Sequence, residues 1–64
     1  MIYEFWLEQV NNELLQLQGE TTEDYFFLNW VEIYKQGIEP RNAALEAING
    51  SFKDMFLNNQ NGDI

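Results

Sequence analysis

The chain has 64 residues, with no cysteine and no histidine, and its three basic residues stand against eleven acidic ones for a net charge of −8. This length holds one small domain. The absence of cysteine and histidine excludes disulfides, thiolate zinc sites and catalysis by either residue, while the charge opposes binding to nucleic-acid phosphates or anionic membranes. Hydrophobic residues make up 45%, too many for a disordered acidic tail, so we expect a folded acidic domain.

The first predicted element is a helix over residues 2–18. Its apolar residues recur at helical spacing and share one face: Tyr3, Trp6, Leu7, Val10, Leu14 and Leu17. Glu4 and Glu8 lie on the opposite face, and two apolar residues, Phe5 and Leu15, fall outside the stripe. These two are candidates either for an interface or for burial under another element.

Glycine, threonine and proline positions predict the helix boundaries. Gly19 and Gly37 suit the left-handed residue that ends a helix. Thr21 or Thr22 can cap the second helix. Pro40 suits the first position of the third helix, because its missing N–H has no partner there in any case.

A second helix is predicted from about residue 23 to residue 36. Its expected core face consists of Phe26, Phe27, Trp30, Val31, Ile33 and Tyr34. Tyr25 and Leu28 fall among the charged residues of the other side. They are therefore candidate exposed apolar residues.

A third helix is predicted over residues 41–49, with small residues that allow close packing: Ala43, Ala44 and Ala47. A capping-box pattern at residues 51–54 starts a short fourth helix over residues 52–57. The prediction is an all-α fold, a compact three-helix bundle with a short fourth C-terminal helix. Residues 1–57 form its single domain and residues 58–64 a frayed polar tail.

The stretch from Trp30 to Ala47 carries the pattern W-x3-Y-x2-G-x2-P-x2-A-A-x2-A, filled by Trp30, Tyr34, Gly37, Pro40, Ala43, Ala44 and Ala47. It resembles a signature of very small, mostly uncharacterised proteins encoded by phages and other mobile elements. Every position also has a structural explanation as a core aromatic, helix cap, first-turn proline or close-packing alanine. The resemblance implies a viral inhibitor or adaptor of host machinery in the host cytoplasm, with anti-CRISPR and anti-restriction proteins among the options.

Residues Tyr34 to Ile48 also resemble a helix-turn-helix, in which the third helix would read DNA. That helix carries Arg41 as its one basic residue and also contains Glu46. Phosphate neutralisation dominates affinity for nucleic acid, and this helix cannot supply it. We therefore expect no direct nucleic-acid binding, and interpret the segment as a helical hairpin that closes the bundle.

Catalysis has few candidate residues. Acids are paired at Glu4 and Glu8 and again at Glu20, Glu23 and Asp24, and paired carboxylates can perform acid–base chemistry when they are buried. These pairs lie on predicted polar faces, and the second set lacks the order of a calcium loop. A chain this short is also expected to lack a small-molecule pocket. We expect no catalytic, cofactor or metal site and no enzyme.

Protein binding is the function that the sequence favours. Acids spread over every element attract a basic surface, and apolar residues among them supply affinity. The expected partner-binding residues are Glu4, Glu8, Tyr25, Leu28 and Glu32, and the expected core is Trp6, Val10, Phe27, Trp30, Val31 and Tyr34. The chain is thus predicted to be an acidic inhibitor or adaptor that docks on a basic host protein of defence or nucleic-acid handling. Mimicry of DNA is the most specific form of this hypothesis.

Two alternatives remain open at this stage. The chain could be a homodimer or other oligomeric module whose extra aromatic residues cover one another, or an antitoxin-like or transcription-regulating partner that does not touch DNA. The first ten residues lack a basic region and meet Glu4 and Glu8 early, unlike a signal peptide. No apolar run is long enough to span a membrane. We expect a cytoplasmic protein.

Overall fold

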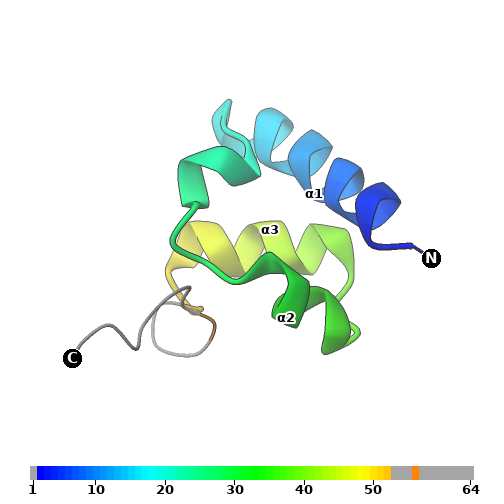
Figure 1. Cartoon of the computed structure of the whole chain (residues 1–64). Coiled ribbons are helices and arrows are strands. Elements are labelled where there is room, and N and C mark those ends of the chain that lie inside the picture. The colour runs from blue at the N-terminus through cyan, green and yellow to red at the C-terminus, as the bar shows by residue number, and fades with distance from the viewer. Residues whose placement is uncertain (1, 53–55, 57–64) are drawn as a thin grey trace.

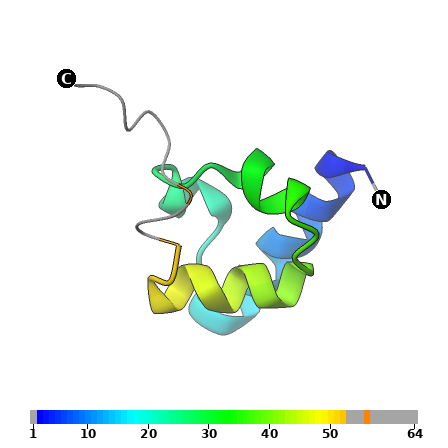
Figure 2. The ribbon, with the colours of Figure 1, turned by 90° about the horizontal axis from the view of Figure 1, so that it is seen from below.

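The computed structural model describes residues 2–52 and Phe56, and the described residues form an all-α fold, as predicted (Figure 1). The elements are α1 (Tyr3–Gln18), the 3-10 helix η1 (Thr22–Tyr25), α2 (Trp30–Lys35) and α3 (Pro40–Asn49). α1 packs chiefly on α3, and the shorter α2 lies beside them (Figures 1 and 2). Most of the predicted fourth helix and the whole of the predicted tail lie outside the described residues.

The predicted boundary residues Gly19 and Pro40 are confirmed, and Thr21 is a cap as predicted, although it caps the short η1 and not a helix that continues to residue 36. Gly19 ends α1 in the left-handed region, with φ 69°, and its N–H donates to the carbonyl of Leu15 over 2.9 Å. Thr21 and Asp24 form a capping box. The Thr21 hydroxyl oxygen accepts the N–H of Glu23 over 3.3 Å, and the Asp24 carboxylate accepts the N–H of Thr21 over 3.0 Å. Pro40 is the first residue of α3. Local chemistry therefore sets where most of these elements start and stop.

The predicted single helix over residues 23–36 is wrong, because the chain forms η1, a turn and then α2. The N–H of Leu28 donates to the carbonyl of Tyr25 over 3.0 Å and closes the turn. Asn29 then caps α2, with its side-chain oxygen accepting the N–H of Glu32 over 3.2 Å. The N–H of Asn29 donates to the carbonyl of Phe56, and not to the carbonyl of Tyr25 as it would in a continuous α-helix. An asparagine that can cap a new helix competes with continuation of the old one.

The break in this segment changes which side chains are buried. Leu28 was expected at the surface, yet it is only 2% exposed. Three residues expected on the core face of the second helix are instead exposed: Phe26 by 75%, Phe27 by 41% and Val31 by 43%. Leu28 and Ile33 stand one residue before and four residues after the Asn29 cap, the positions of a hydrophobic staple, and both are buried in the core. The cap thus turns Leu28 inward.

The core joins α1, α2 and α3. Its buried apolar residues are Trp6, Val10, Leu14, Leu28, Trp30, Ile33, Ala43, Ala44, Ala47 and Phe52. The expected core positions Trp6, Val10 and Trp30 are confirmed, and Tyr34 is half-buried against the same cluster. The three alanines of α3 are small enough to let this helix approach α1 closely. The N-terminal half of α1 meets α2 through aromatic rings, with the Trp6 and Tyr34 centroids 5.4 Å apart.

Candidate partner-binding surface

The outer face of α1 mixes acidic and apolar side chains. Glu4 and Glu8 are exposed, and neither forms an ion pair with any residue that the structure describes. Phe5 is 49% exposed and Leu15 51%, so no described element covers them. Ten residues of helix separate these two, a span of about 15 Å. This face therefore offers two apolar contacts with free carboxylates beside the first.

The third acid of α1 has a structural role. The Glu13 carboxylate accepts a hydrogen bond from the Arg41 guanidinium over 3.0 Å and forms an ion pair that links α1 to α3. The Arg41 side chain is largely exposed, so this pair contributes little to stability. It does occupy the one basic side chain of α3. The carboxylates that remain for a partner on α1 are those of Glu4 and Glu8.

Tyr25 presents part of its ring, while its hydroxyl is already bonded. The hydroxyl donates to the carboxylate of Glu20. Burial raises the pKa of Tyr25 to about 12, with further contributions from that hydrogen bond and from the negative charges of Glu20 and Asp24. Tyr25 is therefore a neutral, oriented ring at neutral pH.

Tyr25, Phe26 and Phe27 form an aromatic corner between η1 and α2. The ring centroids of Tyr25 and Phe27 lie 6.1 Å apart, and those of Phe26 and Phe27 lie 5.9 Å apart. Glu23 and Asp24 are exposed directly before this corner. Large aromatic side chains at the surface are the anchors that protein interfaces favour. The corner was missed in the sequence because the helical spacing assigned Phe26 and Phe27 to the core.

The residues predicted to bind a partner lie on different elements. Glu4 and Glu8 share the outer face of α1, whereas Tyr25 belongs to η1 and Glu32 to α2. Glu32 is half-buried and pairs with Lys35 over 3.8 Å on the same helix. Leu28 lies in the core, so its expected exposure is wrong and its side chain presents no contact surface. The sequence signal that could have shown this is Asn29, a residue suited to begin a new helix.

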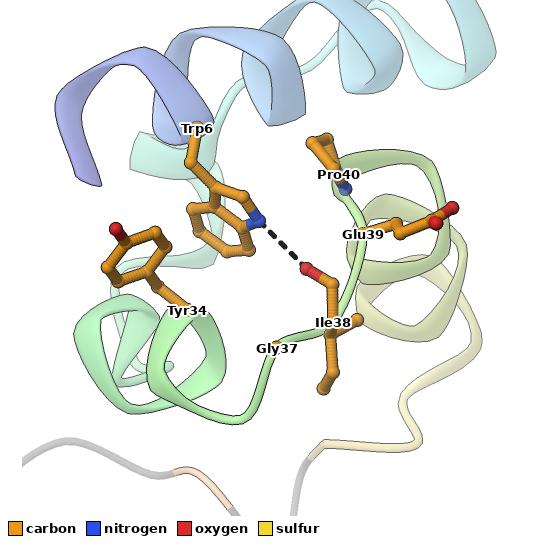
Figure 3. Close-up of a pocket in the computed structure, with 6 residues that line it drawn as sticks. All are labelled: Trp6, Tyr34, Gly37, Ile38, Glu39 and Pro40. Atoms are coloured by element: carbon orange, nitrogen blue, oxygen red, sulfur yellow. Dashed lines mark hydrogen bonds between the residues drawn. The ribbon is translucent and has the colours of Figure 1, made fainter. Parts of the chain in front are cut away.

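A small hollow lies where the connection from α2 to α3 passes the N-terminal half of α1 (Figure 3). Its volume is about 200 Å³, and it is lined by Trp6, Tyr34, Gly37, Ile38, Glu39 and Pro40. The sequence-based expectation concerned a small-molecule pocket, and this hollow is below the roughly 300 Å³ at which such sites begin. The hollow matches a single side chain better than a whole ligand.

A hydrogen bond holds the wall of this hollow in place. The indole Nε1–H of Trp6 donates to the carbonyl oxygen of Ile38 over 2.8 Å, and Figure 3 shows this bond crossing from α1 to the connection. Gly37 adopts φ 77°, and a Cβ built on it would meet no atom within 4 Å. The turn at Gly37 is thus open on its outer side. The side chain of Glu39 points away from the indole (Figure 3).

The described residues carry few other chemical features. Within them, no group of three or more acidic side chains lies close enough together to hold a metal ion. Nor does this part of the chain contain a helix long and apolar enough to cross a membrane. Comparisons with known proteins add no relative: no protein family matches the chain, and neither a curated protein nor a solved structure matches it.

Proposed function

We propose that this chain is a non-enzymatic, acidic protein-binding module, an inhibitor or adaptor that docks on a basic surface of another protein. The observation that supports this most is the exposed aromatic corner in a chain of net charge −8. Burying one exposed phenylalanine side chain contributes about 1.5 to 3 kcal/mol. The surrounding carboxylates would steer a basic partner to it and raise the association rate.

The proposed contact residues come from three elements. Glu4 and Glu8 act from the exposed face of α1, Tyr25 from the end of η1, and Glu32 from α2, where its carboxylate also pairs with Lys35. Phe27 takes the place that the sequence assigned to Leu28, because Phe27 is exposed and Leu28 is not. On this proposal the partner presents lysine or arginine side chains around an apolar spot.

The nature of the partner is proposed from the resemblance and the charge together. A phage-encoded protein acting in the host cytoplasm on a defence or nucleic-acid-handling protein fits both. Such proteins carry basic surfaces for nucleic acid, and an acidic module could cover one. The chain itself is proposed not to bind nucleic acid, since α3 presents Arg41 already paired with Glu13.

Affinity capture with matched charge variants tests the proposal. Glu4→Gln with Glu8→Gln removes two acids, and Gln18→Lys with Asn42→Lys raises the net charge equally at exposed sites elsewhere. We expect a basic protein to be retained at low salt by the wild type and by the lysine control, but poorly by the glutamine variant and by Phe27→Ser. Equal loss of retention in the glutamine and lysine variants, with Phe27→Ser unaffected, would show that the captured protein responds only to bulk charge. Equal retention by all four chains would show that neither these charges nor Phe27 contributes to capture. Either result would overturn the proposal.

Self-association is the second candidate function, favoured by the half-exposed Phe5 and Leu15 on α1. Two copies could bury these residues against each other, as small domains often do. The charge of −8 on each copy opposes this at low salt. Sedimentation of the pure protein at low and high salt distinguishes the two: a dimer that Phe5→Ser dissociates supports self-association, and a monomer throughout excludes it.

A further inference from the structure

We infer that the pair Asn49–Gly50, at the C-terminal end of α3, is a self-modification site at which the chain converts Asn49 into aspartate or isoaspartate. The inference does not depend on the proposed function, because the reaction needs water and no partner protein. Asn49 is the last residue of α3 and is exposed. Its side-chain amide makes no hydrogen bond with any residue that the structure describes, so it is open to attack.

The backbone nitrogen of Gly50 is the nucleophile of this reaction. After it loses its proton to hydroxide, its electron pair attacks the side-chain carbonyl carbon Cγ of Asn49, and a bond forms between these two atoms. The bond from Cγ to Nδ2 breaks, and that nitrogen takes a proton from water and leaves as ammonia. One water molecule then opens the five-membered cyclic imide at either carbonyl, which gives aspartate or isoaspartate. One water is consumed, one ammonia is released, and nothing is oxidised or reduced.

Similar turns occur elsewhere in the fold, where they should not react. Within the described residues, three glycines adopt the left-handed conformation, and an amide residue precedes each of them: Gln18–Gly19, Gln36–Gly37 and Asn49–Gly50. Glycine has no Cβ, so its nitrogen is less shielded than that of any other residue. The glutamine side chain is one methylene longer, so the same attack would have to close a six-membered ring, which forms more slowly. Asn49 is therefore the reactive position among these three.

The last turn of α3 holds the reaction back. The Gly50 N–H donates to the carbonyl of Ala47 over 3.1 Å, and the N–H of Ser51 donates to that of Glu46 over 3.0 Å. Ring closure also requires the backbone of Asn49 to rotate away from its helical ψ, which keeps Cγ apart from the next nitrogen. The turn must therefore open before Gly50 can attack, and helix ends open at low free energy.

Phe52 anchors the chain just after this turn. Its side chain is buried in the core, and its ring stands edge-on to that of Phe56 with centroids 5.2 Å apart. Ala47 is buried on the preceding side. Asn49 and Gly50 thus form a short stretch between two buried anchors, and loosening Phe52 should speed the reaction. The product weakens the turn further, because a new carboxylate at a helix C-terminus opposes the helix dipole.

The test incubates the full chain at mildly alkaline pH, native and in denaturant, and follows the conversion by mass spectrometry. Trypsin cleaves after Arg41 and Lys53, and the peptide between these sites contains Asn49 together with Asn42, which precedes an alanine and serves as the internal control. The second Asn–Gly pair of the sequence, Asn61–Gly62, lies outside the described residues and falls in another peptide. We expect native Asn49 to be converted about tenfold or more slowly than denatured Asn49, because the turn must open first.

Two variants separate the chemistry from the gating. Asn49→Gln gives this turn the Gln–Gly sequence of the other two and should abolish the conversion at residue 49. Phe52→Leu keeps an apolar anchor of smaller size, so it should raise the native rate and the hydrogen exchange of the Gly50 amide, while the rate in denaturant stays the same. Native Asn49 that remains intact while the denatured chain reacts would overturn the inference, as would equal rates at Asn42 and Asn49. Equal native and denatured rates, or a native rate unchanged in Phe52→Leu, would overturn the gating.

Discussion

The indole of Trp6 and the backbone of Ile38 are joined by a 2.8 Å hydrogen bond that spans 32 residues of sequence (Figure 3). Trp6 is buried in the core, where the indole N–H is the one hydrogen-bond donor of its side chain, and this bond satisfies that donor. The same bond fixes the connection from α2 to α3. It thereby couples the stability of the fold to the shape of the hollow.

Trp6→Phe should therefore lower the free energy of unfolding by about 2 to 3 kcal/mol, through a lost hydrogen bond and a smaller ring in the core. Chemical denaturation followed by circular dichroism measures this. The amide of Gly37 should also exchange with solvent faster, because the connection is no longer tied to α1. An unchanged unfolding midpoint would show that the bond does not stabilise the connection.

The burial of Leu28 gives a second prediction. Leu28→Ala should cost about 2 to 5 kcal/mol, since it removes a fully buried side chain. Phe27→Ala, one position away, should cost clearly less, because much of that ring faces solvent. If the two variants had reversed stabilities, the uninterrupted helix expected from the sequence would describe this segment better.

Trp30→Ala should unfold the domain. Loss of a large core aromatic costs about 3 to 5 kcal/mol, comparable to the whole stability of a domain this small. Val31→Ala, on the same helix but 43% exposed, is the matched control and should remain helical. A folded, fully helical Trp30→Ala protein would contradict the core assignment.

Alkaline pH should destabilise the fold through Tyr25. Its pKa rises from 10.0 to about 12 in the folded chain, so the unfolded chain ionises first as the pH increases. The contribution is fully present below pH 10 and is lost as the pH rises through about 12. Comparing the pH dependence of unfolding for wild type and Tyr25→Phe isolates it. A decline of the same size in Tyr25→Phe would assign the effect to other groups.

The sequence predicts this fold well where one residue decides the local backbone. Gly19 and Pro40 define helix ends by their own conformational limits, and Thr21 does so with its side chain. The prediction from sequence fails between Tyr25 and Trp30, because there the helical spacing of apolar residues favours one continuous helix while Asn29 favours the start of a new one. The cap prevails, and the burial of the neighbouring side chains changes with it.

The candidate site was predictable only in part, for a related reason. The exposure of Glu4 and Glu8 follows from a single uninterrupted helix, so it could be predicted from spacing alone. The hollow depends on contacts between Trp6 and a connection 32 residues away, which no local pattern contains. The aromatic corner depends on the broken helix. Both features therefore required the tertiary structure.

The most direct test of the proposed function is the salt dependence of a purified complex. With the captured partner in hand, the dissociation constant is measured by titration calorimetry over a series of NaCl concentrations for wild type and Phe27→Ser. We predict that binding by the wild type weakens steadily as salt rises, and that Phe27→Ser binds about tenfold more weakly at every concentration. Affinity that is independent of salt and unaffected by Phe27→Ser would contradict an acidic, aromatic docking surface.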